Sequence, residues 1–262
     1  MTWFGRRRNA TLGGGHRWRG ARRRGGGADL PAGSPLGIVL PSACAIGLAQ
    51  AATTSSTIFR RWTISTLRRG KPCAHLVFPR WAVDMAPVFL LSLAYELSLA
   101  NEAATADRRA RAAVEMSRGG LTMIAGQAID VTRGDAPVAE TDLVQLARLK
   151  AGAFYGASAM VGAILCGANA AEAAAIRGAG ESLGLAYQML DDVADVTASV
   201  EEIGKDPGLD DGKFTIVDRV GVDGARRRAV EFQAAALARL EGFGREADFL
   251  RSLITEASWK AS

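Results

Sequence analysis

The sequence has few cysteines and no long apolar run, and each shortage excludes a class of protein. Its 262 residues include three cysteines, Cys44, Cys73 and Cys166, which are widely spaced and in no metal-ligand pattern. They exclude a disulfide framework and predict a reducing, cytoplasmic compartment. No run of 18 apolar residues occurs, so we expect no membrane-spanning segment. The start, MTWFGRRRNA, lacks the apolar core and the cleavage signal of a secretory peptide.

Acidic residues are almost absent from the first part of the chain. Residues 1–80 hold 14 Lys and Arg residues against one acid, Asp29, whereas residues 81–262 hold the other 18 bases and 26 acids. Such an asymmetry can indicate a nucleic-acid-binding arm. We do not favour this function, because the basic part lacks interleaved aromatic residues and any known nucleic-acid module. Residues 1–35 are rich in Gly and Arg, show no helical period, and are predicted to be irregular or disordered.

Proline is absent between Val138 and Asp206, and alanine dominates the second half of the chain, which favours packed helices. We interpret residues 65–72 as a loop. We predict one helix over residues 82–100 and one or two helices over 107–133, broken around Gly119 and Gly120. A further helix is predicted to open at 140–142 and to carry Lys150, and a buried helix is predicted over 151–169. The last predicted helices cover residues 171–198, 214–221, 223–242 and 244–257. No strand alternation is evident, so residues 36–262 are predicted to form a single all-α domain, an orthogonal and antiparallel helix bundle.

The most informative stretch is AYQMLDDVAD at 186–195, late in the helical region. On a helix, Asp191 and Asp195 share a face because they are four residues apart, and Asp192 lies one step round. Three carboxylates so close together repel one another unless a cation joins them. Oxygen-rich clusters suit Mg²⁺, which completes its shell with waters and substrate phosphates. A solvated acidic helix face is the alternative interpretation.

A second charged stretch, IGKDPGLDDGKFTIV at 203–217, follows the acidic helix. It places Lys205 and Lys213 in a loop rich in Gly and Asp. Lysines near bound Mg²⁺ can hold phosphate oxygens as point charges. Together, the acidic triplet and the paired lysines predict a site for a metal ion and a diphosphate.

Five stretches in this order resemble motifs of the trans-isoprenyl diphosphate synthases, or polyprenyl synthetases, which make farnesyl and geranylgeranyl diphosphates. The stretch at 186–195 resembles the second aspartate-rich motif of that family, and GKDPGLDDGKFT resembles the lysine loop that follows it. The other three are GGLTMIAGQAIDV at 119–131, which resembles a Gly-Gln segment, LARLKAGAF at 146–154, which resembles a lysine helix, and STLRRGKP at 65–72, which resembles an Arg-Arg-Gly stretch. The resemblance covers residues 65–257 well and residues 36–52 less closely.

The resemblance implies Mg²⁺-dependent condensation of isopentenyl diphosphate with an allylic diphosphate, in a homodimer whose apolar helices enclose a prenyl cavity. It implies that Lys150 and Gln188 are catalytic residues. The implied metal ligands are Asp191, Asp192, Asp195 and Asp210, and the implied substrate contacts are Arg68, Arg69, Lys150, Lys205, Lys213 and Gln50. Gln127 and Asp130 are interpreted instead as residues that cap or pack between helices.

The first aspartate-rich motif of the family is missing from this chain. Its acidic pairs should stand at residues 57–58 and 63–64, where the chain has Thr-Ile both times. No carboxylate occurs between Asp29 and Asp84. With one acidic motif in place of two, a Mg²⁺ cluster would lose about half of its protein ligands.

A pair of compensating frame shifts, one near Ala52 and one near Ser65, is our hypothesis for the missing motif. Residues 57–64 can be encoded by ACG ATC TTC CGT CGA TGG ACG ATT. Read one base earlier, behind the G of a TCG codon for Ser56, the same bases encode Asp-Asp-Leu-Pro-Ser-Met-Asp-Asp. Sequencing the gene across these codons tests the hypothesis, and codons that cannot encode the acidic motif in the shifted frame would rule it out.

Two other functions stay open at this point. A catalytically inactive homologue could act as a regulatory subunit of an active prenyl synthase. The missing motif favours this function, as does Ala151, where the family usually has threonine. A terpene cyclase is also all-α and Mg²⁺-dependent, but the loop with Lys205 and Lys213 and the Arg-Arg-Gly stretch argue against it.

Overall fold

The computed structural model describes residues 66–68, 71–197 and 213–257. The chain divides into two units, Met1–Leu30 and Pro31–Ser262, and every described residue belongs to the second unit. The predictions for residues 1–35, and for the suspect window at residues 53–64 between the two proposed frame shifts, therefore lie outside the described residues.

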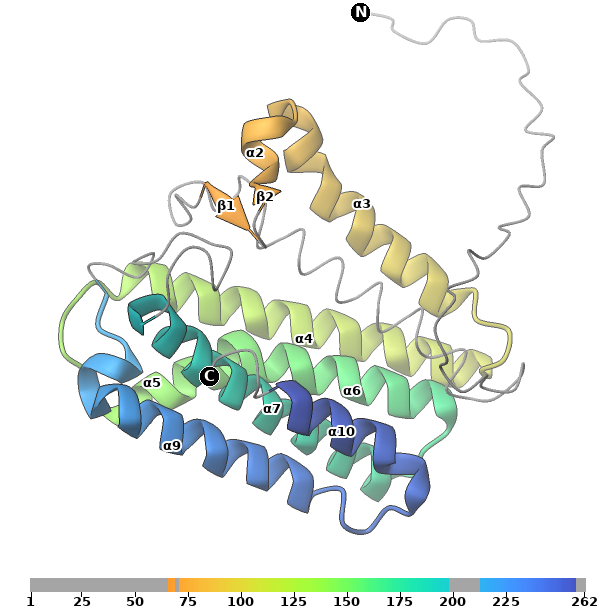
Figure 1. Cartoon of the computed structure of the whole chain (residues 1–262). Coiled ribbons are helices and arrows are strands. Elements are labelled where there is room, and N and C mark those ends of the chain that lie inside the picture. Colours follow the sequence, from red (N-terminus) through yellow and green to blue (C-terminus); the bar gives the residue numbers. More distant parts are fainter. Residues whose placement is uncertain (1–65, 69–70, 198–212, 258–262) are drawn as a thin grey trace, which may run out of the picture. The chain divides into compact units, whose positions relative to one another are not determined.

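Helices make up almost all of the described chain, which confirms the predicted all-α class (Figure 1). Where a loop was predicted, β1 (Leu67–Arg68) instead pairs antiparallel with β2 (Lys71–Pro72). The helices are α2 (Ala74–Val77), α3 (Arg80–Leu99), α4 (Ala106–Thr132), α5 (Glu140–Ala147), the π-helical turn η2 (Arg148–Gly152), α6 (Ala153–Cys166), α7 (Ala170–Thr197), α9 (Ile216–Ala238), the 3₁₀ turn η3 (Arg245–Ala247) and α10 (Asp248–Ala257).

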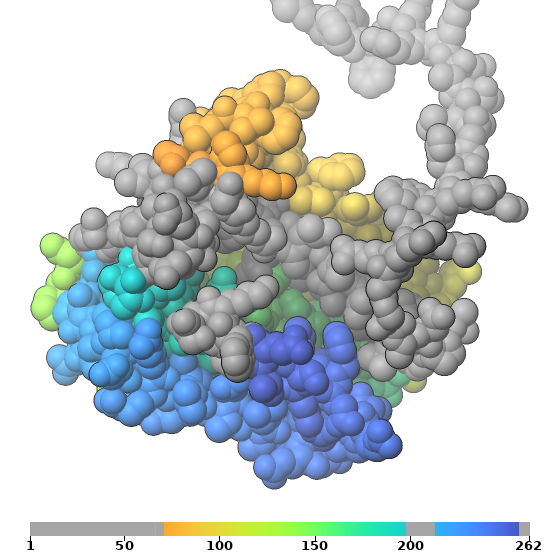
Figure 2. All heavy atoms as spheres, in the orientation of Figure 1, coloured from red at the N-terminus to blue at the C-terminus, as the bar shows by residue number. Residues whose placement is uncertain are grey.

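The core lies between long helices that pack side by side (Figure 1). α6 packs between α4 and α7, and α7 also packs against α9. α10 lies beside α9 (Figure 2). Three apolar clusters fill these contacts: one joins α3, α4 and α6, a second joins α5, α7 and α9, and a third joins α7, α9 and α10. The second cluster, which includes Leu143, Leu185, Met189, Val193 and Ile216, lies directly beneath the site described below.

α4 is one continuous helix, so the predicted break around Gly119 and Gly120 is wrong. A Cβ at Gly119 would collide with the Cβ of Ala157 on α6, and a Cβ at Gly126 would lie 2.8 Å from atoms of Leu149. These two glycines therefore allow neighbouring backbones to approach closely. The packing offsets the roughly 1 kcal/mol by which each glycine disfavours a helix relative to alanine.

One further predicted helix boundary is confirmed, and another is corrected. The predicted gap between 214–221 and 223–242 is confirmed as a kink within α9, where Gly221 has φ 73° and ψ 167°. The helix predicted to open at 140–142 ends as an α-helix at Ala147, and Lys150 lies in η2 instead. A single turn of π-helix within a longer helical run is frequent at functional sites.

Two helical stretches, Arg80–Leu99 and Glu140–Cys166, are long and apolar enough to cross a membrane by length and composition. Core helices of globular proteins meet the same criterion, and half of the apolar window in Glu140–Cys166 is buried inside the structure. The window in α3 is 22% buried, so α3 presents much of its apolar surface outward. The absence of a membrane-spanning segment stays a prediction.

Candidate functional site

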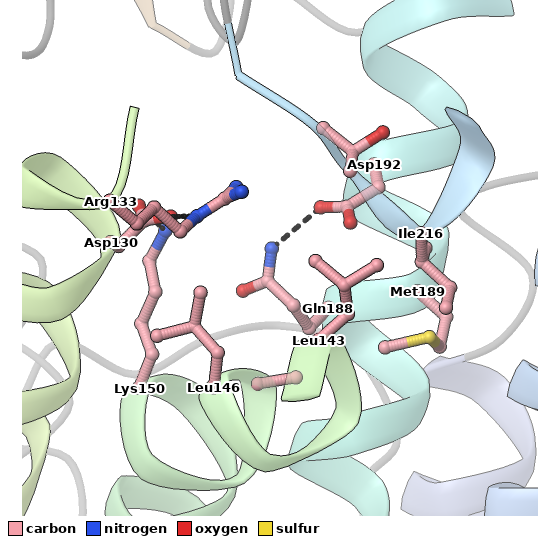
Figure 3. Close-up of a pocket in the computed structure, with 11 residues that line it drawn as sticks. Asp130, Arg133, Leu143, Leu146, Lys150, Gln188, Met189, Asp192 and Ile216 are labelled. Carbon is pink, nitrogen blue, oxygen red and sulfur yellow. Dashed lines mark hydrogen bonds and ion pairs between the residues drawn. The ribbon is translucent and has the colours of Figure 1, made fainter. Parts of the chain in front are cut away.

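A pocket opens where α4, α5, η2, α7 and the start of α9 meet, and charged side chains face one another across it (Figure 3). Asp130, Arg133 and Lys150 line one side, and Gln188 and Asp192 on α7 line the other. Apolar side chains lie between the two sides, namely Leu143, Leu146, Ala147, Met189 and Ile216. The pocket is small, with a cavity volume of about 30 Å³, and it opens to solvent.

Asp130 is the centre of the charged side of the pocket. Its carboxylate, 6% exposed, accepts from Lys150 Nζ at 2.9 Å and from Lys213 Nζ at 3.3 Å, both at Oδ2. Arg133 Nε lies 3.4 Å from Oδ1. Three cations therefore surround one anion, and this side of the pocket carries a net positive charge that suits a phosphate-rich ligand.

The charge state of Asp130 follows from its neighbours. Burial by itself would raise the pKa of the Asp130 carboxyl, but the charges of Lys150, Lys213 and Arg133, with the hydrogen bond from Lys150, outweigh burial and hold this pKa below its usual value. The carboxylate is therefore ionised throughout the neutral range. It holds the two lysine side chains close together, although electrostatic repulsion would otherwise separate them.

Sequence reasoning missed Asp130, which it interpreted as a packing or capping residue. One feature of the sequence could have indicated that Asp130 belongs to the site: it lies in the Gly-Gln stretch at 119–131, next to the predicted lysine helix. Its partner Lys213 is 83 residues away in the sequence, and only the packed helices bring the two together.

The π-helical turn η2 directs two basic side chains to different helices. Lys150 reaches Asp130 on α4, whereas Arg148 Nη1 lies 3.9 Å from Glu181 Oε2 on α7. Glu181 also accepts from Arg177 at 3.0 Å, and Arg177 pairs in turn with the buried Glu115 of α4. This chain of ion pairs ties α4, α7 and η2 together and so holds the turn that presents Lys150.

The acidic helix brings one of its three aspartates into the pocket. Gln188 Nε2 donates to Asp192 Oδ1 at 2.7 Å, and both residues line the pocket. Asp195 is buried within the bundle. Asp191 lies near Tyr155, whose pKa is raised to about 12 by burial first and then by Tyr187 and the charge of Asp191. Of the predicted site residues, Lys150, Gln188 and Asp192 line the pocket, and Lys213 reaches its wall by pairing with Asp130. The pocket lining does not include Asp191 or Asp195.

The donor groups that could hold a metal ion are few. Within residues 66–68, 71–197 and 213–257, no group of three or more His, Cys, Asp or Glu side chains could hold one by itself. Mg²⁺ can bind through one or two carboxylates when phosphate oxygens complete its shell, and Asp192 suits that mode because it faces the pocket. Of the other predicted site residues, Arg68 lies in β1, and Arg69, Gln50, Lys205 and Asp210 lie outside the described residues.

A family model described as polyprenyl synthetase matches residues 64–232, which is more than half of the chain. The chain belongs to the polyprenyl synthetase family. The match includes Asp130, Lys150, Gln188, Asp192 and Lys213, and it begins at residue 64, the last residue of the window in which the first acidic motif is missing. The resemblance stated from the sequence is therefore confirmed.

This polyprenyl synthetase has several plant relatives. It is 35% identical over 216 residues to geranylgeranyl pyrophosphate synthase 6, mitochondrial, of Arabidopsis thaliana, covering 78% of this chain and 64% of that protein. It is 31% identical over 215 residues to geranylgeranyl pyrophosphate synthase, chloroplastic, of Catharanthus roseus, covering 80% of this chain and 60% of that protein. The chain thus spans about three fifths of the length of these relatives.

Solved structures share the fold. An FPP/GFPP synthase from Zymomonas mobilis superposes with a TM-score of 0.70 at 26% identity, covering 84% of this chain and 75% of that one. A geranyltransferase from Helicobacter pylori, crystallised with magnesium and isoprenyl diphosphate, has a TM-score of 0.70 at 23% identity and covers 86% and 74% of the two chains. The second likeness supports the all-α fold alone.

Proposed function

We propose that this polyprenyl synthetase condenses isopentenyl diphosphate with an allylic diphosphate to form a short-chain product of the farnesyl or geranylgeranyl kind. One observation carries the proposal. Lys150 and Lys213, far apart in the sequence, meet at the buried Asp130, and Asp130 and Lys150 face Gln188 and Asp192 across one pocket. The similarity to plant geranylgeranyl pyrophosphate synthases supports the same substrate class.

In this proposal the cations around Asp130 hold the diphosphate that leaves. As the allylic C–O bond breaks, its electron pair stays on the diphosphate, and the charges of Lys150 and Lys213 stabilise the developing anion. The double bond of isopentenyl diphosphate then bonds to the allylic carbon, and loss of a proton completes the longer prenyl diphosphate. Gln188 would lie beside the reacting allylic end. The apolar helices would form the prenyl cavity and exclude water.

Mg²⁺ is the cofactor that we propose for the reaction. Asp192 would hold it together with diphosphate oxygens, and Asp191, Asp195 and Asp210 are further proposed ligands from the acidic helix and the loop after it. When bound, it would supply positive charge to the leaving diphosphate. Arg68, Arg69, Lys205 and Gln50 remain proposed contacts of the two substrates.

The activity can be tested by supplying labelled isopentenyl diphosphate, geranyl diphosphate and Mg²⁺ and by separating the labelled products. We expect farnesyl or geranylgeranyl diphosphate from the chain as written. The variant with aspartate at 57, 58, 63 and 64 should be faster by about a hundredfold, the magnitude typical of restored electrostatic stabilisation. If neither chain forms a longer prenyl diphosphate, the proposed activity is wrong. If the chain is inactive alone but raises the rate of an active synthase, the regulatory function replaces it.

We also propose that the protein is a homodimer that buries apolar surface on α3 and α4. Large apolar side chains are exposed on both helices, including Trp81, Phe89, Leu121 and Ile124. Removing this surface from water would stabilise a dimer by about 25 cal/mol for each Å².

A charge placed within this surface should dissociate the dimer. Leu121 is 65% exposed on α4, so the folded monomer can accept Leu121→Glu, whereas a dimer would bury an unpaired carboxylate. We expect analytical ultracentrifugation to show a dimer for the unmodified chain and at least a tenfold weaker self-association for this variant. Val230→Glu, at a 63% exposed position on α9, is the matched control and should remain dimeric. Equal self-association of both variants would place the interface elsewhere.

A cytoplasmic location remains a proposal. Within the described residues, Cys73 is a free thiol, as a reducing compartment would maintain it. Fractionation of the source cells, with detection of the protein by antibody, tests the location, and recovery in an organelle fraction would contradict it.

A further inference from the structure

Arg133 connects the two sequence segments that supply the charged side of the pocket. It follows α4 directly, and its side chain is 14% exposed. Its Nη1 donates to the backbone carbonyl of Phe214 at 2.6 Å, and its Nε lies 3.4 Å from Asp130 Oδ1. The planar guanidinium group can make both contacts at once because its donors point in fixed, divergent directions.

The contact with Phe214 acts on the residue next to Lys213. The Phe214 side chain packs against the cluster that joins α5, α7 and α9, and Thr215 begins α9 with a capping box to Asp218. The backbone amide and the hydroxyl of Thr215 donate to Asp218 Oδ2 at 2.7 and 2.8 Å. The backbone after Lys213 is thus anchored by the packing of Phe214, by the cap of α9 and by Arg133. Among these three contacts, only Arg133 also touches the carboxylate of Asp130, which Lys213 binds.

We propose that Arg133 is a positioning residue, which anchors the backbone at Phe214 so that the Lys213 ammonium is held beside Lys150 for diphosphate binding. The inference deepens the proposed function and rests on it for the ligand. Arg133 acts through Lys213. Loss of Arg133 leaves the Lys213 side chain in the protein but lets the backbone at residues 213–214 move away from Asp130.

Hydrogen exchange tests the anchoring step without any ligand. Arg133→Gln should raise the exchange rates of the backbone amides of residues 214–218 about tenfold, the effect of losing a charge-assisted hydrogen bond. The matched control is Arg111→Gln within α4, where Arg111 forms a surface ion pair with Asp107. This control should leave exchange at 214–218 unchanged. Unchanged exchange in Arg133→Gln as well would overturn the proposal.

Binding of inorganic diphosphate in the presence of Mg²⁺, measured by calorimetry, tests the coupling to Lys213. We expect Arg133→Gln to weaken binding about tenfold and Arg133→Lys to recover part of the loss, because an ammonium restores the charge but cannot make both contacts. In the double variant with Lys213→Met, the losses should be less than additive, because Arg133 acts through Lys213.

The possible results separate this inference from the proposed function. Additive losses in the double variant would show that Arg133 acts independently of Lys213 and would overturn the inference. If the unmodified protein binds no diphosphate, the proposed function fails. The exchange rates at 214–218 then decide by themselves whether Arg133 anchors this segment.

Discussion

Replacing Asp130 by asparagine is expected to lower the melting temperature by about 6 °C or more. Removing one partner of a buried ion pair costs roughly 3–5 kcal/mol, and each kcal/mol shifts the melting temperature of a chain of this size by about 2–4 °C. Asp130 is shared by Lys150, Lys213 and Arg133, so the variant leaves three neighbouring cations without the carboxylate that joins them. Because the lysines are partly exposed and can turn towards water, we expect the loss of stability to lie nearer to about 3 than to about 5 kcal/mol.

Differential scanning calorimetry at neutral pH measures this effect. Asp107→Asn is the matched control on the same helix. Asp107 is 77% exposed, and its ion pair with Arg111 is 3.7 Å long, so this variant should melt within about 2 °C of the unmodified chain. Equal melting temperatures for the two variants would show that the cluster around Asp130 does not stabilise the fold.

The stability difference caused by Asp130 should depend on pH with a definite sign. The pKa of Asp130 is lowered in the folded protein from its ordinary value of 3.8. A lowered pKa means that the ionised carboxylate stabilises the fold at every pH above the ordinary value, and that this contribution is lost as the pH falls through the lowered value. Melting curves of the unmodified chain and of Asp130→Asn should therefore differ by a constant amount between neutral pH and about pH 5, and should approach each other below about pH 4.

Replacing Lys150 by methionine is expected to lower kcat/KM for the proposed condensation by about 100- to 1000-fold. Removal of a single preorganised group that stabilises charge in a transition state typically has this effect. Methionine keeps much of the volume of the lysine stem but removes the ammonium that lies 2.9 Å from Asp130. Lys213 remains paired with Asp130, so the fold should persist while half of the lysine pair is lost.

The rate is measured with labelled isopentenyl diphosphate under single-turnover conditions, and circular dichroism confirms the fold of each variant. Arg111→Met removes an exposed cation from α4 and should retain the unmodified rate within about twofold. A folded Lys150→Met protein with an unchanged rate would remove Lys150 from the proposed mechanism. It would not affect the stability expected of Asp130→Asn, so the two experiments test separate claims.

Most of the helices follow from local sequence patterns. α7 was predicted at 171–198 and lies at Ala170–Thr197, because a proline-free, alanine-rich stretch favours helix wherever its apolar side is buried. The predicted gap in α9 was also correct, since Gly221 adopts a positive φ that other residues rarely take. The order of the motifs correctly predicted the family. Lys150, Gln188 and Asp192, which the sequence proposes as site residues, line one pocket.

The errors share one physical cause, which is that they concern contacts between distant segments. Gly119 suggested a helix break, but Ala157 packs against it and α4 continues. Asp130 suggested a packing residue, but three cations converge on it. Arg133 drew no attention in the sequence, because its partner is a backbone carbonyl, which every residue possesses.

The amino-acid sequence by itself determined the all-α class, the helix boundaries to within a few residues and the kinds of side chain available for binding a diphosphate. These properties depend on local periodicity and on residue chemistry, both of which can be read along the chain. The tertiary structure alone decided which charges meet, because ion pairs form between side chains that are neighbours in space. The packing of α4, η2, α7 and α9 places Lys150 and Lys213 on one buried carboxylate and selects Asp192 as the aspartate of the triplet that lines the pocket.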